Sequence, residues 1–343
     1  MTLYRNIQGF AIKSYAGDPA NPKEGQIWYN SVSQKLRGRN NAAYADGEIW
    51  YNTSSNTFKI GLQVGAWASG GTVNTARRYT NGGGTQTAGL MVNGYSTGFS
   101  ADTEEYNGSS WTSVTNAPFA VYNSSGGGTQ TSFFMTGGDL GPSVNTVTAE
   151  YDGSNWTTTN NNPNARNGGG GCGTQTAGLY AGGQGNTGTQ TYNGSSWTST
   201  GHSLNEARKE VSQAMTGITT AAVIVGDQPS SAVVEEYNGS SWTSQTAVPT
   251  AGYARSSSGI QTSALYYGGG SSGFGGTTAA LYDGSAWTNV ADLATPRGGG
   301  ASGKNASTSS LAFMAGGQTP GPSNSNATEE WTNAAGIKTV TTS

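Results

Sequence analysis

The sequence predicts an all-β fold, and three observations carry that prediction. The chain of 343 residues contains 55 glycines, whereas charged residues make up only 10% of it. Aromatic residues make up a further 10% and include 9 Trp and 17 Tyr. A short phrase of Tyr, Asn or Asp, Gly and Trp also recurs at nearly constant spacing. This combination is typical of many short strands joined by tight turns, and a disordered chain would be richer in charge and poorer in aromatics.

The repeated phrase sets the period of the fold. YNGSSWT begins at Tyr106, and close copies follow at separations of 45, 41, 45 and 45 residues, beginning at Tyr151, Tyr192, Tyr237 and Tyr282. A period of about 40–45 residues matches one four-stranded blade of a β-propeller. Within each unit, a Gly-rich run leads to an apolar strand that ends in small residues, as in FFMTGG (133–138). The sequence therefore predicts a propeller over residues 61–343.

The Asn-Gly or Asp-Gly pair between Tyr and Trp predicts a type I′ turn, because both central residues of that turn need positive φ. The turn is expected to join the third and fourth strands of each blade. Asn107, Asn193 and Asn238 also begin formal glycosylation triplets, but Asp152 and Asp283 hold the same place elsewhere, so a turn explains all five. One Trp per blade at fixed phase predicts packing between blades, with sugar stacking as the alternative.

The two ends of the array predict six blades. Trp67 stands 44 residues before Trp111 without a preceding Tyr phrase, and Trp331 holds the Tyr position of a last repeat that has no later Trp strand. Six Tyr-type positions therefore match six Trp positions. We expect the strand around Trp67 to complete the C-terminal blade, because closure removes the open sheet edge. Closure by the tail 337–343 is the alternative.

Two charged features share the same period. The first is an Arg after the Trp strand, at Arg77, Arg166, Arg208, Arg255 and Arg297, with Val121 in its place in one blade. Such a ring could bind an anionic ligand near the axis, but a structural role in satisfying loop carbonyls is favoured. The second is an acidic pair before the Tyr position, at 104–105, 235–236 and 329–330. Adjacent strand residues face opposite ways, which favours a structural role over glycoside hydrolysis.

The order of apolar strand, Gly pair, Tyr and Trp resembles the Kelch repeat over about residues 61–343. The departures are Asn93-Gly94 and Gly226-Asp227 in place of the Gly pair, and Trp331 in place of Tyr. Kelch-like propellers include the galactose-oxidase type, whose copper site needs two His ligands. This chain has one histidine, His202, so the resemblance implies a non-catalytic propeller with no cofactor and no metal. No phosphate-binding loop or Ser-His-Asp set is recognisable, and we expect no enzyme activity.

Residues 1–60 are predicted to form a separate N-terminal module. EGQIWYN (24–30) is echoed by DGEIWYN (46–52), and each copy predicts a small β-hairpin. This GxIWYN phrase resembles short modules of phage tail-fibre and other virion proteins. The resemblance implies docking through Trp28, Tyr29, Trp50 and Tyr51. Two small hairpins bury little apolar surface alone, so these aromatics are expected to cover the propeller, an identical chain in a homo-oligomer, or another virion protein.

Loop length predicts where a ligand would bind. The stretch between the second and third strands varies from 9 to 14 residues across the blades, and loops carry function more often than the scaffold does. These loops share one face of the predicted ring and hold Tyr95, Phe99, Asp139 and Phe274. We expect these residues to bind a glycan or protein of a host surface, and ordinary loop aromatics are the alternative.

Charge and cysteine content narrow the partners. The net charge is −3, and residues 61–343 hold 9 Lys and Arg against 15 Asp and Glu, which argues against nucleic acid. No apolar run reaches membrane-span or signal-peptide length, and the lone Cys172 cannot form an internal disulfide. The resemblance of residues 1–60 to virion modules implies a bacteriophage virion protein made in the host cytoplasm, a tail fibre for host attachment and receptor binding. Alternatives are a capsid decoration or head-fibre protein, or a non-viral Kelch-like lectin or scaffold.

Overall fold

The computed structural model describes the strands of residues 13–15, 27–30, 35–38 and 49–52, and residues 57–339 except 142–144, 165, 227, 271–273, 305–308 and 322; side chains are described from 65 to 333 with the same gaps. The chain divides into two compact units, one of residues 66–332 and one of residues 1–65 together with 333–343. Strand β5 (Thr57–Ser69) runs through the predicted domain boundary after residue 60.

The smaller unit contains the two predicted hairpins. In the first, β2 (Ile27–Asn30) pairs antiparallel with β3 (Lys35–Gly38), and β1 (Lys13–Tyr15) adds a parallel strand to β2. In the second, β4 (Ile49–Asn52) pairs antiparallel with the start of β5. The docking candidates Trp28, Tyr29, Trp50 and Tyr51 lie on β2 and β4, and their side chains fall outside the described ones, so docking stays a prediction.

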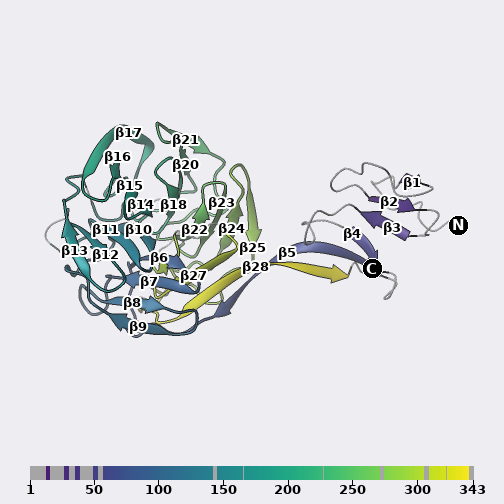
Figure 1. Ribbon diagram of the computed structural model, residues 1–343, viewed down its shortest axis with the longest axis horizontal. Helices are drawn as coiled ribbons and strands as arrows, with labels where there is room; N and C mark the ends of the chain where they lie inside the picture. The colour runs from purple at the N-terminus through teal and green to yellow at the C-terminus, as the bar shows by residue number, and fades with distance from the viewer. Residues whose placement is uncertain are drawn as a thin grey trace. The chain divides into compact units, whose positions relative to one another are not determined.

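The larger unit is a six-bladed β-propeller, as the sequence predicted. Figure 1 shows the blades arranged around a common centre, and each is an antiparallel sheet of four consecutive strands except at the closure. The first five blades are, in order, β6 (Asn81–Thr85), β7 (Ala88–Val92), β8 (Thr103–Tyr106), β9 (Trp111–Val114); β10 (Ser125–Thr129), β11 (Ser132–Thr136), β12 (Thr148–Tyr151), β13 (Trp156–Thr159); β14 (Gly170–Thr174), β15 (Ala177–Ala181), β16 (Asn186–Tyr192), β17 (Trp197–Arg208); β18 (Met215–Ile218), β19 (Ala221–Val225), β20 (Val234–Tyr237), β21 (Trp242–Gln245); and β22 (Ser256–Ile260), β23 (Ser263–Tyr267), β24 (Ala279–Tyr282), β25 (Trp287–Val290).

The sixth blade closes the ring with the strand around Trp67. Its order is β26 (Ala301–Ser302), β27 (Leu311–Ala315), β28 (Thr328–Thr339) and β5. The Trp67 ring lies 5.5 Å from that of Trp331 and 4.9 Å from that of Tyr267. The Gly70 amide donates to the Thr328 carbonyl at 2.9 Å. Closure by the N-terminal strand is therefore confirmed, and it joins residues about 260 positions apart in the chain without leaving an open edge.

The turn between the third and fourth strands differs from the predicted type I′ geometry. Tyr106 and Trp111 pair directly, so four residues make the loop. Gly108 has φ of 90°, whereas Asn107 is not among the described residues with positive φ. The Asn107 side-chain oxygen instead accepts from the amides of Ser109 and Ser110, both at 2.9 Å. The type I′ prediction is wrong because this Asx turn uses the side chain of Asn or Asp, and positive φ at the Gly alone, to reverse the chain.

The Trp residues pack between blades, as predicted. In every interface, the indole N–H donates to an acceptor of the preceding blade or of the connection that follows it. Trp111, Trp197 and Trp242 donate to the hydroxyls of Thr328, Thr148 and Thr189 at 2.7–2.8 Å. The other three donate to carbonyls: Trp67 to Ala291, Trp156 to Thr115 and Trp287 to Thr246. These tryptophans are hydrogen-bonded packing residues and not free stacking platforms.

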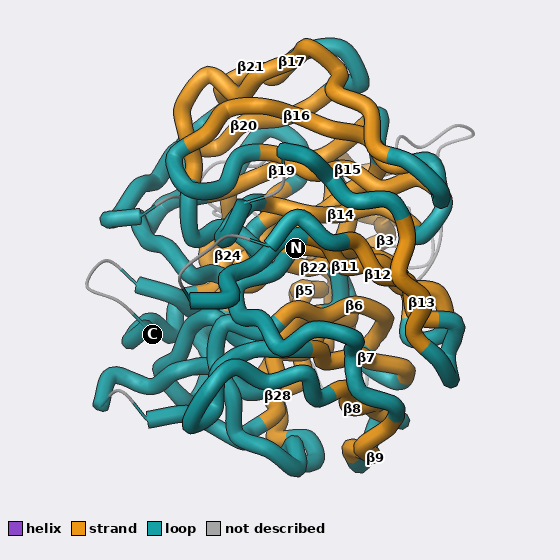
Figure 2. The backbone as a smooth tube through the Cα atoms, turned by 90° about the vertical axis from the view of Figure 1, so that its left-hand side faces the viewer, coloured by secondary structure: helices purple, strands orange, loops and turns teal. Residues whose placement is uncertain are grey.

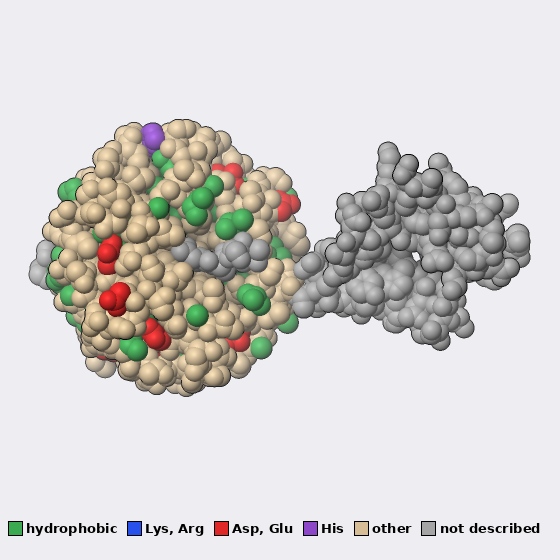
Figure 3. Space-filling view, in the orientation of Figure 1, with side chains coloured by type: hydrophobic (Ala, Val, Ile, Leu, Met, Phe, Trp, Pro, Cys, Tyr) green, Lys and Arg blue, Asp and Glu red, His purple; other side chains and the backbone are tan. Residues whose placement is uncertain are grey.

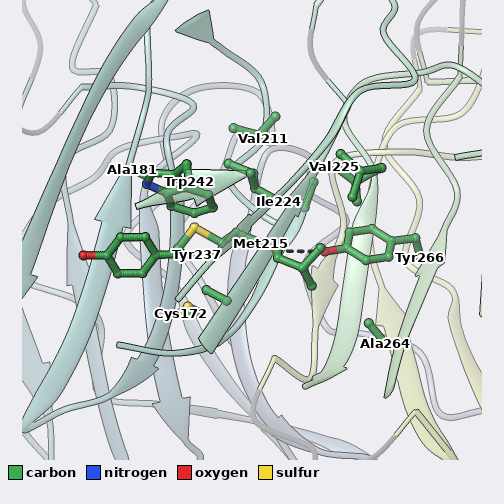
Figure 4. Close-up of a cluster of buried hydrophobic side chains, with 14 of the residues drawn as sticks. Cys172, Ala181, Val211, Met215, Ile224, Val225, Tyr237, Trp242, Ala264 and Tyr266 are labelled. Atoms are coloured by element: carbon green, nitrogen blue, oxygen red, sulfur yellow. Dashed lines mark hydrogen bonds between the residues drawn. The ribbon is translucent and has the colours of Figure 1, made fainter. Parts of the chain in front are cut away.

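Buried side chains between neighbouring blades form the core. The largest cluster joins the third, fourth and fifth blades and includes Met215, Trp242 and Tyr266 (Figure 4). The Tyr266 hydroxyl donates to the Val223 carbonyl at 3.0 Å, so the one polar atom of that buried ring is satisfied. Cys172 lies in the same cluster and is fully buried, as expected for a small strand residue.

The described part of the chain contains strands and loops without a helix (Figure 2). Consequently no helix among the described residues is long and apolar enough to span a membrane. On the face seen in Figure 3, acidic side chains are scattered and hydrophobic side chains form small, separate patches.

Candidate binding site at the mouth of the ring

The two residues of each acidic pair make two different repeated contacts. One is an ion pair with Arg, and the other is a hydrogen bond with the Tyr of the next blade. The first Glu of each pair is buried and meets the periodic Arg that leads into its blade: Arg77 with Glu104 at 3.0 Å, Arg208 with Glu235 at 2.7 Å, and Arg297 with Glu329 at 3.2 Å. Each carboxylate also accepts from two backbone amides of the segment just before its Arg, such as those of Asn74 and Thr75. Buried charges need such pairing and hydrogen bonds.

The second, third and fifth blades lack the buried Glu, and the second also lacks the Arg. Val121 stands at the Arg position of the second blade, and Ala149 stands where its partner carboxylate would be. In the fifth blade, Ala280 holds the Glu position, and Arg255 donates instead to the Thr250 carbonyl at 2.7 Å. Burial lowers the pKa of Arg255 to about 10. The structural interpretation of the buried arginines is therefore confirmed at Arg77, Arg208 and Arg297, while Arg166 is partly exposed.

The second Glu of each pair faces the next blade and accepts from its Tyr. Tyr151 donates to Glu105 at 2.9 Å, Tyr192 to Glu150 at 2.8 Å, and Tyr106 to Glu330. Glu236 lies beside Tyr282 in the same position, although without the geometry of a hydrogen bond. Leu281 replaces the Glu in the fifth blade, and the residue opposite is Trp331, whose indole donates elsewhere, to the Ser309 carbonyl. The departure at Trp331 thus has a physical reason.

Above this framework, six equivalent residues with positive φ surround the axis where the chain enters each inner strand. They are Tyr79, Asn123, Gly168, Glu210, Ala254 and Gly299, with φ between 52° and 66°. Backbone hydrogen bonds link them around the ring, for example from the Asn123 amide to the Tyr79 carbonyl at 2.8 Å and from the Gly299 amide to the Ala254 carbonyl at 2.8 Å. This end of the ring is called the mouth below.

Four of the six mouth residues carry side chains in a conformation that glycine adopts without strain. A left-handed non-Gly residue costs roughly 1–2 kcal/mol, and such strain clusters at functional sites. The two glycines show that the backbone does not need a side chain here. Tyr79 and Glu210 both lie in a pocket, which indicates that their side chains are retained for what they contact.

The pocket has a volume of about 210 Å³ and is lined by Arg78, Tyr79, Tyr95, Phe99, Tyr122 and Glu210. The Phe99 and Tyr122 rings stack with centroids 5.4 Å apart, and Tyr79 lies 5.4 Å from Tyr122. The Arg78 guanidinium lies 4.7 Å from the centre of the Tyr95 ring, a cation–π arrangement. Aromatic faces with one guanidinium and one carboxylate suit a ligand that offers both a flat apolar face and polar groups.

Neighbouring loops brace the pocket. Arg78 donates to the side-chain oxygen of Asn324 at 3.1 Å, and the Asn324 amide nitrogen donates to the Tyr95 and Ser96 carbonyls. On the other side, the Glu210 carboxylate accepts from the Asn123 side chain at 2.9 Å. A side chain at Gly168 would collide with the Glu210 amide at 2.7 Å. The lining residues are therefore held by contacts between blades.

The four predicted binding residues meet at this mouth. Tyr95 and Phe99 line the pocket directly. Asp139 accepts from the Tyr122 hydroxyl at 3.1 Å and from the Asn167 side chain at 2.8 Å, so it holds Tyr122 in place. Phe274 packs edge-on against Tyr79 with centroids 5.0 Å apart, next to the pocket but outside its lining. All four residues therefore lie at the same end of the ring, while their role in binding stays a prediction.

The hydroxyls of Tyr79 and Tyr122 stay protonated near neutral pH. Burial raises the pKa of Tyr122 to about 12, with a further contribution from Asp139. Burial, and then the nearby Glu210 carboxylate, raise the pKa of Tyr79 well above its ordinary value. Both side chains can therefore present a neutral O–H group together with an aromatic face.

Variation in loop length drew attention to the connection between the second and third strands of a blade, which carries Tyr95 and Phe99. It gave no indication of the other lining residues. Arg78, Tyr79, Tyr122 and Glu210 lie on the connection from one blade to the next. The sequence held a usable signal, because Tyr79 and Glu210 each follow a periodic Arg by two residues, where Gly168 and Gly299 stand in other blades. A large side chain at a position that other repeats fill with glycine marks a departure from the scaffold.

Below the mouth, a buried polar network fills the centre of the ring. Gln213 donates to Asn81 at 3.0 Å and accepts from Ser302 at 3.0 Å, which ties the fourth blade to the first and the sixth. The Lys304 ammonium is fully buried and donates to the carbonyls of Gly171 at 3.1 Å and of Ser212. Burial lowers the pKa of Lys304 to about 7. The described residues contain no group of three His, Cys, Asp or Glu side chains placed to hold a metal.

Comparison with known proteins supports the fold. No protein-family model matches the chain, and a search of curated proteins gave no match. Among solved structures, one described as "Structure of YjhT" is similar, with a TM-score of 0.63 at 12% sequence identity. The match covers 78% of this chain and 99% of that chain. At this identity the likeness concerns the propeller fold alone.

Proposed function

We propose that the chain is a bacteriophage virion structural protein, a tail-fibre or receptor-binding component that attaches to the particle through its N-terminal module and binds a host-surface glycan or protein at the mouth of a Kelch-like propeller. The aromatic pocket formed by Arg78, Tyr79, Tyr95, Phe99, Tyr122 and Glu210 is the observation that carries this proposal. It is a braced, concave site on one face of a rigid ring, which is the arrangement expected of a displayed binding domain.

Binding is favoured over catalysis by the chemistry of the lining. The pocket offers phenol groups with raised pKa values, one guanidinium and one carboxylate that is already hydrogen-bonded to Asn123. General acid–base work needs a group that titrates near the working pH, and this lining is suited to recognition through ring stacking and hydrogen bonds. The proposal needs neither a cofactor nor a metal.

The virion assignment rests on the smaller unit. The GxIWYN phrase resembles modules of tail-fibre and virion proteins, and each of its copies begins a strand pair, β2 with β3 and β4 with β5. Two strand pairs of this size cannot bury much apolar surface alone, so Trp28 and Trp50 call for a partner surface. We propose that other virion proteins supply it, which places the protein in the phage particle. A membrane or a nucleic acid has no part in the proposal.

Attachment is tested by particle incorporation of the full chain. Particles purified from the encoding phage should contain the wild-type chain, and a variant with Trp28→Ala and Trp50→Ala should be lost from them while its propeller melts at the wild-type temperature. Equal incorporation of this variant would refute docking through these residues.

Recognition is tested on glycan arrays and on host cells with the full chain. Phe99→Ala and Tyr95→Ala should reduce binding at least tenfold, because truncating an aromatic contact residue in a concave site commonly costs more than about 1.4 kcal/mol. Leu311→Ala is a matched control, since Leu311 is an exposed apolar residue, 44% accessible, outside the pocket lining. Absence of any wild-type binding would sink the receptor-binding proposal and leave a passive decoration protein as the better assignment.

A further inference from the structure

The interface between the third and fourth blades keeps the Tyr of the repeat but lacks the Glu that faces it. Thr191 stands before Tyr192, where the first, second, fourth and sixth blades have Glu. The Tyr237 hydroxyl of the fourth blade therefore has no carboxylate partner from the third. It lies instead 2.6 Å from Nδ1 of His202 and donates to the Gly239 carbonyl at 3.0 Å. At this interface a short side chain, Thr191, stands where the repeat has a long one, and His202, the single histidine of the chain, lies beside the Tyr hydroxyl.

The third blade is also built differently at its outer edge. Strand β17 runs over twelve residues, Trp197–Arg208, whereas the outer strands β9, β13, β21 and β25 have four each. Its pairing with β16 is irregular, with register shifts between Asn186 and Gln190. Such bulges re-aim side chains. The added length carries His202 to the Tyr237 hydroxyl.

The missing glutamate leaves a groove of about 470 Å³ between the two blades. Six threonines line it, together with two tyrosines, Asn193, Ala177 and Gly239; the threonines are Thr176, Thr191, Thr198, Thr200, Thr219 and Thr220, and the tyrosines are Tyr192 and Tyr237. Thr176, Thr219 and Thr220 lie in turns between first and second strands. Those turns are at the opposite ends of the strands from the mouth loops, so the groove and the mouth pocket open on opposite faces.

The lining indicates the kind of ligand. It contains no Lys, Arg, Asp or Glu, so a charged ligand would find no opposite charge to offset its desolvation. Each threonine hydroxyl can both donate and accept, and the two tyrosines, 2% and 1% exposed, lie at the base of the groove. The volume lies within the range of about 300–1,000 Å³ typical of small-ligand sites.

We propose that this groove is a second binding site, which takes a sugar unit of a neutral glycan. The threonine hydroxyls pair with the hydroxyls of the sugar, and Tyr192 and Tyr237 form the apolar floor. The inference does not depend on the proposed function, because the groove shares no residue with the mouth pocket.

Restoring the repeat at one residue tests the site. Thr191→Glu places at this interface the carboxylate that Tyr237 lacks, and it should occupy the groove while keeping or raising the melting temperature. Thr158→Glu is the matched control, since it makes the same substitution at an exposed position of an outer strand, β13, away from the groove. Thr176→Arg, at an exposed turn residue of the lining, provides a second blocking variant if Thr191→Glu folds poorly.

The full chain is titrated by calorimetry with maltotriose, cellotriose and chitotriose, with trigalacturonate as the charged comparator. We expect at least one neutral trisaccharide to bind the wild type and Thr158→Glu equally, and to bind Thr191→Glu and Thr176→Arg at least tenfold more weakly. Failure of all three neutral sugars to bind, preference for trigalacturonate, or unchanged affinity in the folded blocking variants would each overturn the proposal. Unchanged affinity would also show that the sugar binds elsewhere, for instance at the mouth.

Discussion

Two interfaces of the ring, one between the first and second blades and one between the third and fourth, differ at one position of a shared arrangement. In the former, Glu105 accepts a hydrogen bond from the Tyr151 hydroxyl at 2.9 Å. In the latter, Thr191 leaves Tyr237 to His202 and opens a groove. The difference teaches that the long side chain of the repeat spans the interface, whereas the short one leaves a groove even though His202 takes over the Tyr hydroxyl.

Other departures are compensated, which sharpens the contrast. Val121 occurs with Ala149, and Trp331 occurs with Leu281, so each missing polar group is matched by a missing partner. A buried polar group without its partner costs free energy, while replacing both partners by apolar groups can be nearly neutral.

Breaking one buried Arg–Glu pair should have the largest effect. Arg208→Ala leaves the Glu235 carboxylate buried without its guanidinium, and removal of one partner of a buried pair commonly costs about 3–5 kcal/mol. Urea denaturation measures the loss. The double variant Arg208→Val with Glu235→Ala copies the second blade and should recover much of the stability; a double variant as unstable as the single one would contradict the idea of compensation.

The buried Lys304 should make stability rise with pH between 7 and 9. Its pKa is about 7 in the folded protein and about 10.4 in an unfolded chain. In this interval the unfolded chain therefore binds the extra proton, and stability increases with pH. The difference in unfolding free energy between wild type and Lys304→Met should change by roughly 2 kcal/mol over these two pH units, because Lys304 is already half deprotonated in the folded protein at pH 7. Denaturant melts at both pH values measure it, and a difference independent of pH would contradict the burial of a titrating amine.

Copying the irregular interface into a regular one should have an intermediate effect. Glu105→Thr removes the acceptor of the Tyr151 hydroxyl, which should cost about 1–3 kcal/mol. Glu105→Gln keeps an acceptor oxygen and should cost less. If Glu105→Thr melts like the wild type, the Glu–Tyr pairs do not hold the blades and the reading of Thr191 as a departure loses its basis.

Relieving strain at the mouth should have the smallest effect. Glu210→Gly removes a side chain held at φ of 57°, so the gain from relaxed backbone, roughly 1 kcal/mol, should offset the lost hydrogen bond from Asn123. We expect the free energy of unfolding of Glu210→Gly, measured by thermal denaturation, to lie within about 1 kcal/mol of the wild-type value. Gly299→Ala provides the comparison and should destabilise, because its Cβ would approach the Tyr79 amide at 3.3 Å in a left-handed conformation.

The ring was predictable because its Tyr and Trp positions are periodic and their numbers match only if Trp67 closes the last blade. The turn type was not predictable, because the pair Asn-Gly fits several turns. The choice among them depends on the register in which the Tyr and Trp strands pair. Half of the mouth was predictable from loop length; Tyr79 and Glu210 lie on the other connection and come together only across the axis. The groove is formed by turns of two blades, and its one sequence signal is Thr191 at a Glu position.

The central claim is that the ring is a scaffold whose mouth is presented to a target on the host. A cryo-electron microscopy map of particles from the encoding phage tests it most directly. The account predicts a six-bladed ring at an exposed end of a tail fibre, with the N-terminal module against another virion protein and the pocket of Tyr95, Phe99 and Tyr122 facing outward. A ring on the head would favour the decoration protein, and a mouth buried against the particle, or particles without this chain, would contradict the account.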